Sequence, residues 1–124
     1  MNFATAINCM DGRVQLPVIK WICERYGVDY VDMVTEAGPV KILADNGDAV
    51  LLESMRKRVE ISVNKHGSRI VAIVAHFDCA GNPVEKDVQI GQIKKSFETV
   101  RSWGFEVEMI GLWVDENWEV NQVM

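Results

Sequence analysis

Continuous apolar runs alternate with amphipathic segments along this chain of 124 residues, and this alternation restricts the fold more than any other feature. The apolar runs are rich in β-branched residues and have the length of strands, whereas the amphipathic segments have helical spacing. The expected strands cover residues 3–8, 30–35, 69–75 and 105–114. The expected helices cover about residues 15–26, 47–65 and 86–103.

Repeated strand–helix–strand units build a parallel sheet through right-handed crossovers. The strands are apolar throughout, as expected when helices cover both faces of a sheet. We therefore predict a single three-layer α/β domain over residues 1–124, with a mainly parallel sheet in the order 2-1-3-4, counted along the chain. The tail "WVDENWEVNQV" has a polar turn between two short apolar runs, which predicts an antiparallel hairpin at one edge of the sheet.

The helix ends and the core faces of the helices can also be predicted. Asn46 or Asp48 is expected to cap the second helix, and His66 to interact with the dipole at its C-terminal end. Glycines that can close a helix with a left-handed backbone follow the three helices: Gly27, Gly67 and Gly104. The expected core stripes are Leu16, Ile19, Cys23 and Tyr26; Leu52, Met55 and Val59; and Ile90, Ile93, Phe97 and Val100.

Composition narrows the class of protein. Apolar residues make up 48% and charged residues 25% of the chain, as in a globular protein, and no apolar run is long enough to cross a membrane. The net charge is −5 and the only basic cluster, "RKR" at 56–58, has acidic neighbours, which argues against nucleic acid as a partner.

No signal peptide precedes the first strand, so a cytoplasmic location is expected. Three cysteines indicate metal or thiol chemistry more than a disulfide framework.

Two strands are followed directly by residues that bind metals. Cys9 comes just after the first strand, and His76 and Cys79 come just after the third. In the order 2-1-3-4 these strands are neighbours at the point where the winding reverses, where open α/β sheets bind ligands. Two thiolates and an imidazole suit Zn²⁺, and three protein ligands leave the fourth position open, as in a catalytic site. We therefore predict a zinc site formed by Cys9, His76 and Cys79.

Asp11 and Arg13 follow Cys9 at two-residue intervals, so an extended loop directs all three toward the same side. A carboxylate beside a guanidinium stays ionised and oriented. Asp11 could accept a proton or hydrogen bond from a zinc-bound water, or could itself become the fourth ligand.

These motifs resemble those of the β-class carbonic anhydrases, whose signature is C-x-D-x-R followed by H-x-x-C at the end of a later strand. Here the motifs read "CMDGR" at 9–13 and "HFDC" at 76–79. The resemblance implies a parallel-core α/β fold, Zn²⁺ held by Cys9, His76 and Cys79, and a gating and orienting dyad of Asp11 and Arg13. It also implies attack of zinc-bound hydroxide on CO₂ to give bicarbonate, with COS or CS₂ as related substrates, and a homodimer.

The sequence departs from the family pattern at several positions near these motifs. The chain has "TEAG" where the family usually has R-N-A-G, so that Glu36 replaces an amide; Glu36 could face the site or be a solvated loop acid. Alanines replace the usual glycines at Ala75 and Ala80. Gly38 is expected to allow a tight backbone turn, and Asp78 to cap the helix that follows.

Two other functions remain open at the level of sequence. The chain could be a non-catalytic zinc-binding or regulatory module that keeps the site without turnover. It could also be a thiol enzyme with Cys9 or Cys79 as the nucleophile, although neither a C-x-x-C pair nor a C-x₅-R loop is present. Zinc content and CO₂ hydration distinguish these functions from the leading one.

Overall fold

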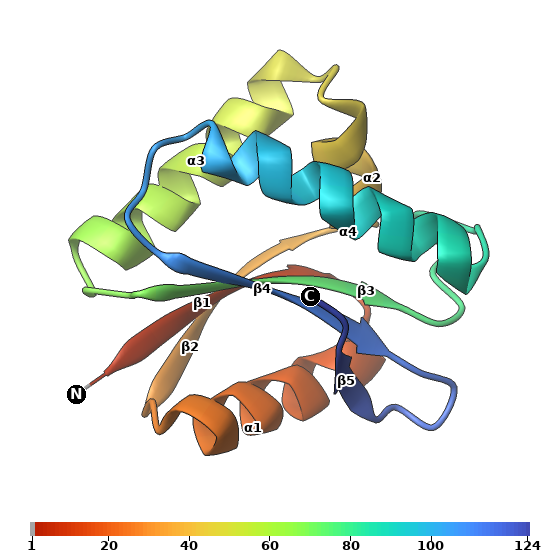
Figure 1. The fold of residues 1–124 in the computed structure, drawn as a ribbon, viewed down its shortest axis with the longest axis horizontal. Helices are drawn as coiled ribbons and strands as arrows, with labels where there is room; N and C mark the ends of the chain where they lie inside the picture. Colours follow the sequence, from red (N-terminus) through yellow and green to blue (C-terminus); the bar gives the residue numbers. More distant parts are fainter. Residues whose placement is uncertain (1) are drawn as a thin grey trace.

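A computed structural model describes residues 2–124 and contains one five-stranded sheet with four α-helices (Figure 1). The strands are β1 (Phe3–Cys9), β2 (Tyr30–Glu36), β3 (Ile70–His76), β4 (Glu108–Val114) and β5 (Val120–Gln122). The helices are the short 3₁₀ helix η1 (Gly12–Val14), α1 (Gln15–Tyr26), α2 (Pro39–Asp45), α3 (Ala49–Asn64) and α4 (Lys86–Arg101). None of the helices in this part of the chain is both long and apolar enough to span a membrane.

The sheet has the order β2-β1-β3-β4-β5, which confirms the predicted fold. The pairs β2–β1, β1–β3 and β3–β4 are parallel. The short β5 pairs antiparallel with β4 and forms the expected edge hairpin. Cys9 at the end of β1 is opposite Glu36 of β2, and His76 at the end of β3 is opposite Val114 of β4. The carboxyl ends of the four parallel strands therefore lie together at one end of the sheet, on the right of Figure 1.

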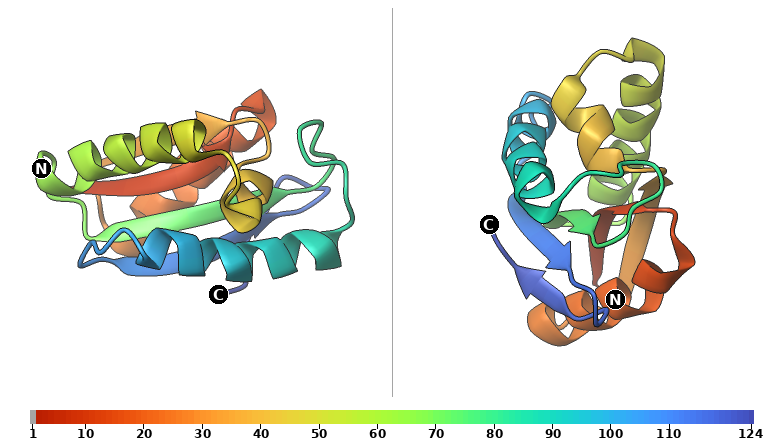
Figure 2. Two further views of the ribbon diagram at one scale, coloured as in Figure 1. Left: turned by 90° about the horizontal axis from the view of Figure 1, so that it is seen from above. Right: turned by 90° about the vertical axis from the view of Figure 1, so that its right-hand side faces the viewer.

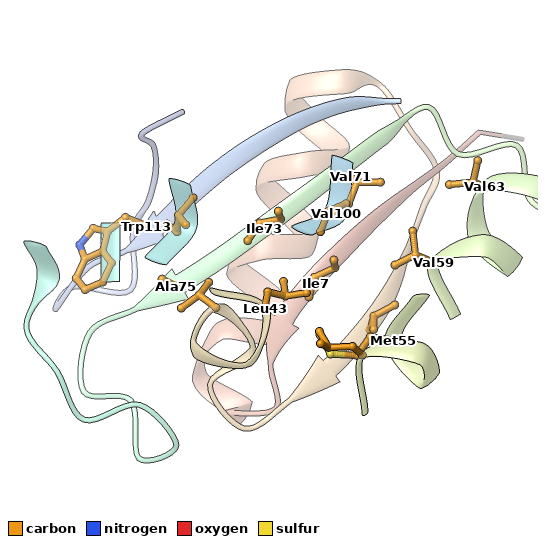
Figure 3. Close-up of a cluster of buried hydrophobic side chains, with 14 residues drawn as sticks. Ile7, Leu43, Met55, Val59, Val63, Val71, Ile73, Ala75, Val100 and Trp113 are labelled. Carbon is orange, nitrogen blue, oxygen red and sulfur yellow. The ribbon is translucent and has the colours of Figure 1, made fainter. Parts of the chain in front are cut away.

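Helices cover both faces of the sheet. Helix α1 lies on one face, and α2, α3 and α4 lie on the other, as the views of Figures 1 and 2 show. Each face has its own apolar core. Ile7, Ile73 and Met55 belong to the larger core under α2, α3 and α4 (Figure 3), whereas Val18 and Ile22 of α1 belong to the smaller one.

Helix α2 was not predicted from the sequence. It has only seven residues, from Pro39 to Asp45. Too short to be stable alone, it packs against α4, where the side-chain hydroxyls of Ser96 and Thr99 donate hydrogen bonds to the carbonyl oxygens of Val40 and Leu43. Tertiary contacts of this kind leave no periodic signal in so short a segment.

The predicted core stripe of α1 is wrong by one helical position. Leu16 is 77% exposed and Cys23 is only half-buried, whereas Val18 and Ile22 are fully buried together with Val14 just before the helix. The spacing of Val14, Val18 and Ile22 is as helical as that of the predicted stripe, so periodicity alone does not distinguish the two stripes. In α3 the expected Leu52, Met55 and Val59 are buried, and in α4 so are Ile93 and Val100.

The helix ends agree with the predictions in part. Gly27 closes α1 in the left-handed conformation, with φ of 65°, and the side chain of Asp48 caps α3 by accepting a hydrogen bond from the Leu51 N–H. His66 lies just beyond α3, and its N–H donates a hydrogen bond to the carbonyl oxygen of Ile61 in that helix. In addition, its Nδ1 lies 2.6 Å from an Asp32 carboxylate oxygen, and its ring stacks on Phe3.

Candidate metal centre

The carboxyl ends of β1 and β3, together with the loop after β3, bring together three side chains that can hold a metal ion. One donor atom from each of Cys9, His76 and Cys79 lies within 4.8 Å of the other two, and all three residues are buried. The sulfur atoms of the two cysteines are 3.9 Å apart. Two thiolates on one tetrahedral zinc ion, each about 2.3 Å from the metal, are about 3.8 Å apart. The spacing of the sulfur atoms therefore fits a shared metal ion and not a disulfide.

The His76 ring is oriented for metal binding. Its Nδ1 donates a hydrogen bond to the carbonyl oxygen of Phe77 at 2.7 Å, which leaves the lone pair of the neutral ring on Nε2. Within residues 2–124, this buried Nε2 has no hydrogen-bond partner. A buried polar atom without a partner is costly, and a metal ion would satisfy it. A backbone carbonyl on the other nitrogen is the usual support of a ligating histidine.

The surroundings of the two cysteines shift their pKa values in opposite directions. Burial alone would raise the pKa of Cys9, but interaction with the His76 ring and with the N–H groups of Gly38 and Asp11 lowers it to about 7. Burial and the neighbouring Cys9 raise the pKa of Cys79 to about 11. Without a metal ion, one thiol therefore ionises near neutral pH and the other does not. A cation is needed to make both of them thiolates.

Two amide side chains, those of Asn8 and Gln15, form hydrogen bonds with the backbone around Cys9. Asn8 accepts a hydrogen bond from the Cys9 N–H and donates one to the carbonyl oxygen of Val14. Gln15 donates to the carbonyl oxygens of Cys9 and Asp11, at 2.7 and 3.0 Å. These bonds fix the backbone on which Cys9 and Asp11 are carried.

Asp11 and Arg13 form the expected pair beside the cluster. Arg13 Nη2 and Nε donate to the Asp11 carboxylate at 2.7 and 3.0 Å, and one carboxylate oxygen lies 4.0 Å from His76 Nε2. Hydrogen bonds from Arg13 lower the pKa of Asp11 to about 2. Asp11 is not among the donors that converge within 4.8 Å. Its carboxylate is therefore ionised and paired with Arg13, next to the cluster and outside it.

Asp78 holds Arg13 from the opposite loop, a role that the sequence did not suggest. Its carboxylate and its carbonyl oxygen accept hydrogen bonds from Arg13 at 3.2 and 3.1 Å. The predicted role of Asp78 as a helix cap is wrong, because α4 begins at Lys86, with Glu85 at the cap position. The left-handed backbone of Asp78, with φ of 57°, turns the side chain toward Arg13. Trp118 in the β4–β5 turn adds a cation–π contact, with its ring 4.4 Å from the guanidinium carbon.

The segment after β2 packs closely against the loop that carries Cys79. Gly38 has a φ of 64°, and a Cβ atom on it would lie 2.9 Å from the backbone of Gly81. The expectation of a tight turn at Gly38 is thus confirmed. Glu36 neither joins the cluster nor extends into solvent as a free acid, because its carboxylate accepts a hydrogen bond from Arg58 of α3.

Comparison with known proteins places the chain in a family. Residues 1–124 match the family model described as putative carbonic anhydrase, and the chain belongs to that family. No curated protein sequence matches the chain.

Several solved structures share the fold. β-Carbonic anhydrase isoform I of Trichomonas vaginalis aligns over 98% of this chain and 81% of its own, with 16% identity and a TM-score of 0.66. Carbonic anhydrase of Streptococcus mutans gives the same coverage, with 14% identity and a TM-score of 0.61. Tetrameric β-carbonic anhydrases of Sordaria macrospora align over 97% of this chain and 79% of theirs, with 12% identity and a TM-score of 0.57. At such identities the likeness establishes the β-carbonic anhydrase fold.

Proposed function

We propose that the protein is a zinc enzyme of the carbonic anhydrase type that interconverts CO₂ and bicarbonate. The observation that carries the proposal is the convergence of the Cys9, His76 and Cys79 donor atoms, with His76 Nε2 left without a partner among residues 2–124. Family membership and the shared fold support it.

Cys9, His76 and Cys79 would hold the zinc ion. When bound, Zn²⁺ supplies a Lewis acid that lowers the pKa of water and so provides a nucleophile at neutral pH. The borderline-soft ion suits two thiolates and an imidazole, and three protein ligands leave one position for water or substrate. Asp11 is held outside the cluster by Arg13, which keeps that position free of a fourth protein ligand.

Asp11 would accept a hydrogen bond from the attacking water and so orient it. Its carboxylate lies 4.0 Å from His76 Nε2, and it stays ionised because Arg13 stabilises the charge. An ionised carboxylate can only accept hydrogen bonds, so it selects a partner that donates one. Arg13 fixes the carboxylate in position with its planar fork, and Asp78 and Trp118 in turn fix Arg13.

The remaining features of the proposal concern the protein as a whole. We propose that residues 1–124 act as one domain that forms a homodimer, and that it works in the cytoplasm, where the three unpaired cysteines stay reduced. CO₂ is the substrate we favour, with COS and CS₂ as the alternatives that the same chemistry would attack.

Zinc content and CO₂ hydration test the proposal together. We expect one zinc ion per chain and CO₂ hydration measurable by stopped flow, with zinc lost in Cys79→Ser and retained in the control Cys23→Ser, whose thiol lies outside the cluster. Asp11→Asn should retain zinc and lose about 10²-fold in rate, because the charged hydrogen-bond acceptor that would orient the attacking water is removed.

The competing functions give different results in the same experiment. A stoichiometric zinc protein that is inert toward CO₂, COS and CS₂ would be a binding or regulatory module, and the enzyme proposal would be wrong. A protein without zinc whose Cys9 or Cys79 reacts covalently with substrate would be a thiol enzyme.

A further inference from the structure

The loop between β3 and α4, residues 77–85, carries Cys79 and runs from the end of the sheet to the first turn of α4, on the right of Figure 1. Its backbone folds around the Cys79 sulfur, because the N–H groups of Gly81 and Asn82 interact with that atom. The position of the sulfur therefore depends on the shape of this loop. The ligands of a metal site must be held within about 0.5 Å of their working geometry.

Gln89 of α4 closes this loop with its side-chain amide. Nε2 donates a hydrogen bond to the carbonyl oxygen of His76, just before the loop, at 2.9 Å, and another to that of Val84, near its end, at 3.2 Å. Gln89 is only 1% exposed, so water hardly competes for these bonds. The two residues that flank Cys79 in the chain are thus bound to one nitrogen atom.

The two hydrogen bonds require a particular kind of side chain. A carbonyl oxygen only accepts hydrogen bonds, so the residue at position 89 must supply two N–H donors. A glutamine has them, whereas a methionine of similar length has none. Gln89 lies on the buried side of α4 with Ile93 and Val100, where an apolar residue would be expected. Its amide is therefore at a position where packing alone does not require one.

A second amide of α4 holds the middle of the same loop. Gln92 follows Gln89 by three residues, which places both on one side of the helix. Its Oε1 accepts a hydrogen bond from the side chain of Asn82 at 2.7 Å, and Asn82 is only 1% exposed. None of these bonds uses a donor atom of the metal-binding cluster, so they are compatible with a bound metal ion.

We propose that Gln89 is a positioning residue of the candidate metal centre: it holds the loop between His76 and Val84 in the shape that places Cys79 beside Cys9. The inference rests on the proposed zinc site and adds a residue that contacts neither metal nor substrate. Groups that support the ligands of a metal ion typically contribute about 10- to 100-fold to its affinity.

The zinc affinities of two variants, measured by competition with a chromophoric chelator, test this role. Gln89→Met keeps the length of the side chain and removes both donors. Thr99→Val is the matched control, because it also removes a buried donor of α4, one whose bond goes to the carbonyl oxygen of Leu43, outside the loop. The zinc dissociation constant should rise at least about tenfold in Gln89→Met and stay unchanged in Thr99→Val.

The contrary results separate this role from the proposed function. Equal affinities in the wild type and Gln89→Met, or an equal loss in both variants, would overturn the role of Gln89 and leave the zinc site standing. A wild-type protein that binds no zinc would overturn the zinc site and this role with it.

Cobalt(II) in place of zinc reports the geometry of the ligands without any turnover. The wild type and Thr99→Val should both show the visible bands of a tetrahedral site and the absorption of thiolate bound to cobalt. In Gln89→Met both should be weaker, because Cys79 is no longer held in place. Identical spectra of the wild type and Gln89→Met would contradict the proposal.

Hydrogen exchange in the wild type tests the contact without a substitution, and so applies even if Gln89→Met does not fold. The side-chain amide protons of Gln89 should exchange at least about tenfold more slowly than those of Gln122, which is exposed on the edge strand. Equal exchange of the two side chains would overturn the proposal.

Discussion

Arg13 joins the two loops of the candidate site by a direct contact with Asp78: Nη1 lies 3.2 Å from the Asp78 carboxylate, and Nη2 lies 3.1 Å from its carbonyl oxygen. The same guanidinium binds the Asp11 carboxylate. Asp78 lies between His76 and Cys79 in the sequence. One side chain thus connects the carboxylate beside the cluster to the segment between two of the three donors.

Replacing Arg13 by lysine should slow the proposed reaction without removing the metal. A lysine keeps the charge but lacks the planar fork that binds Asp11 and Asp78 together. We expect zinc content to remain at one per chain in Arg13→Lys and the rate of CO₂ hydration to fall about tenfold. Arg56→Lys is the matched control, because Arg56 also binds two carboxylates but does so on α3. A rate unchanged in Arg13→Lys, or reduced equally in both variants, would show that the fork has no role.

The Asp11 carboxyl should ionise with a pKa of about 2, and this value should return toward 3.8 when Arg13 is replaced by glutamine. Carbon-13 NMR of the side-chain carboxyl carbon measures it in the metal-free protein. Because the pKa in the folded state is below that in the unfolded state, the shift stabilises the folded protein above pH 3.8, and this contribution is lost as the pH falls toward 2. A carboxyl that titrates at its ordinary value in the wild type would contradict the Arg13–Asp11 geometry.

Gly38→Ala should destabilise the protein and reduce its metal content. The added Cβ would lie 2.9 Å from the Gly81 backbone, and the left-handed φ of 64° alone costs about 1–2 kcal/mol for a residue with a side chain. Gly91→Ala in α4 is the control, because nothing lies within 4 Å of the added Cβ. The higher helix propensity of alanine should stabilise the folded protein by about 0.5–1 kcal/mol. Urea denaturation measures the free energy of unfolding of both variants. An unchanged free energy in Gly38→Ala would show that the segment after β2 and the loop of Gly81 are not tightly packed.

Zinc binding should release at least one proton per ion at pH 8. The pKa of Cys79 is raised to about 11, so this thiol is protonated at pH 8 and must lose its proton to bind metal. The pKa of Cys9 is about 7, so at pH 6.5 this thiol is also largely protonated and the number released should increase. Calorimetry in buffers of different ionisation enthalpy counts these protons. Fewer than one at pH 8 would mean that Cys79 is not a ligand.

The sequence predicted the sheet and the meeting of the two motifs because both depend on strong, local signals. Continuous apolar strands separated by helices require a parallel sheet, and a parallel sheet brings the ends of neighbouring strands together. Cys9, His76 and Cys79 could therefore be placed in one cluster although they are far apart in sequence. The expected pairing of Asp11 with Arg13 is likewise present.

The features that the sequence did not predict depend on backbone conformation or on contacts between distant segments. Nothing in the letters "HFDC" shows that Asp78 has a positive φ, so its contact with Arg13 could not be distinguished from a helix cap. The pairing of Glu36 with Arg58 depends on where α3 crosses the sheet. In α1, two apolar stripes had the same period, and only packing showed that Val18 and Ile22 face the core.

X-ray absorption at the zinc K-edge tests the central claim most directly, because it reports the atoms around the metal whether or not the protein turns over a substrate. If Cys9, His76 and Cys79 hold one zinc ion, the protein should show two sulfur neighbours at about 2.3 Å, one imidazole nitrogen at about 2.0–2.1 Å and one further light atom. Cys79→Ser should lose the metal, and Cys23→Ser should give the wild-type spectrum. A zinc ion surrounded by nitrogen and oxygen alone, or a protein that retains no zinc, would contradict the account.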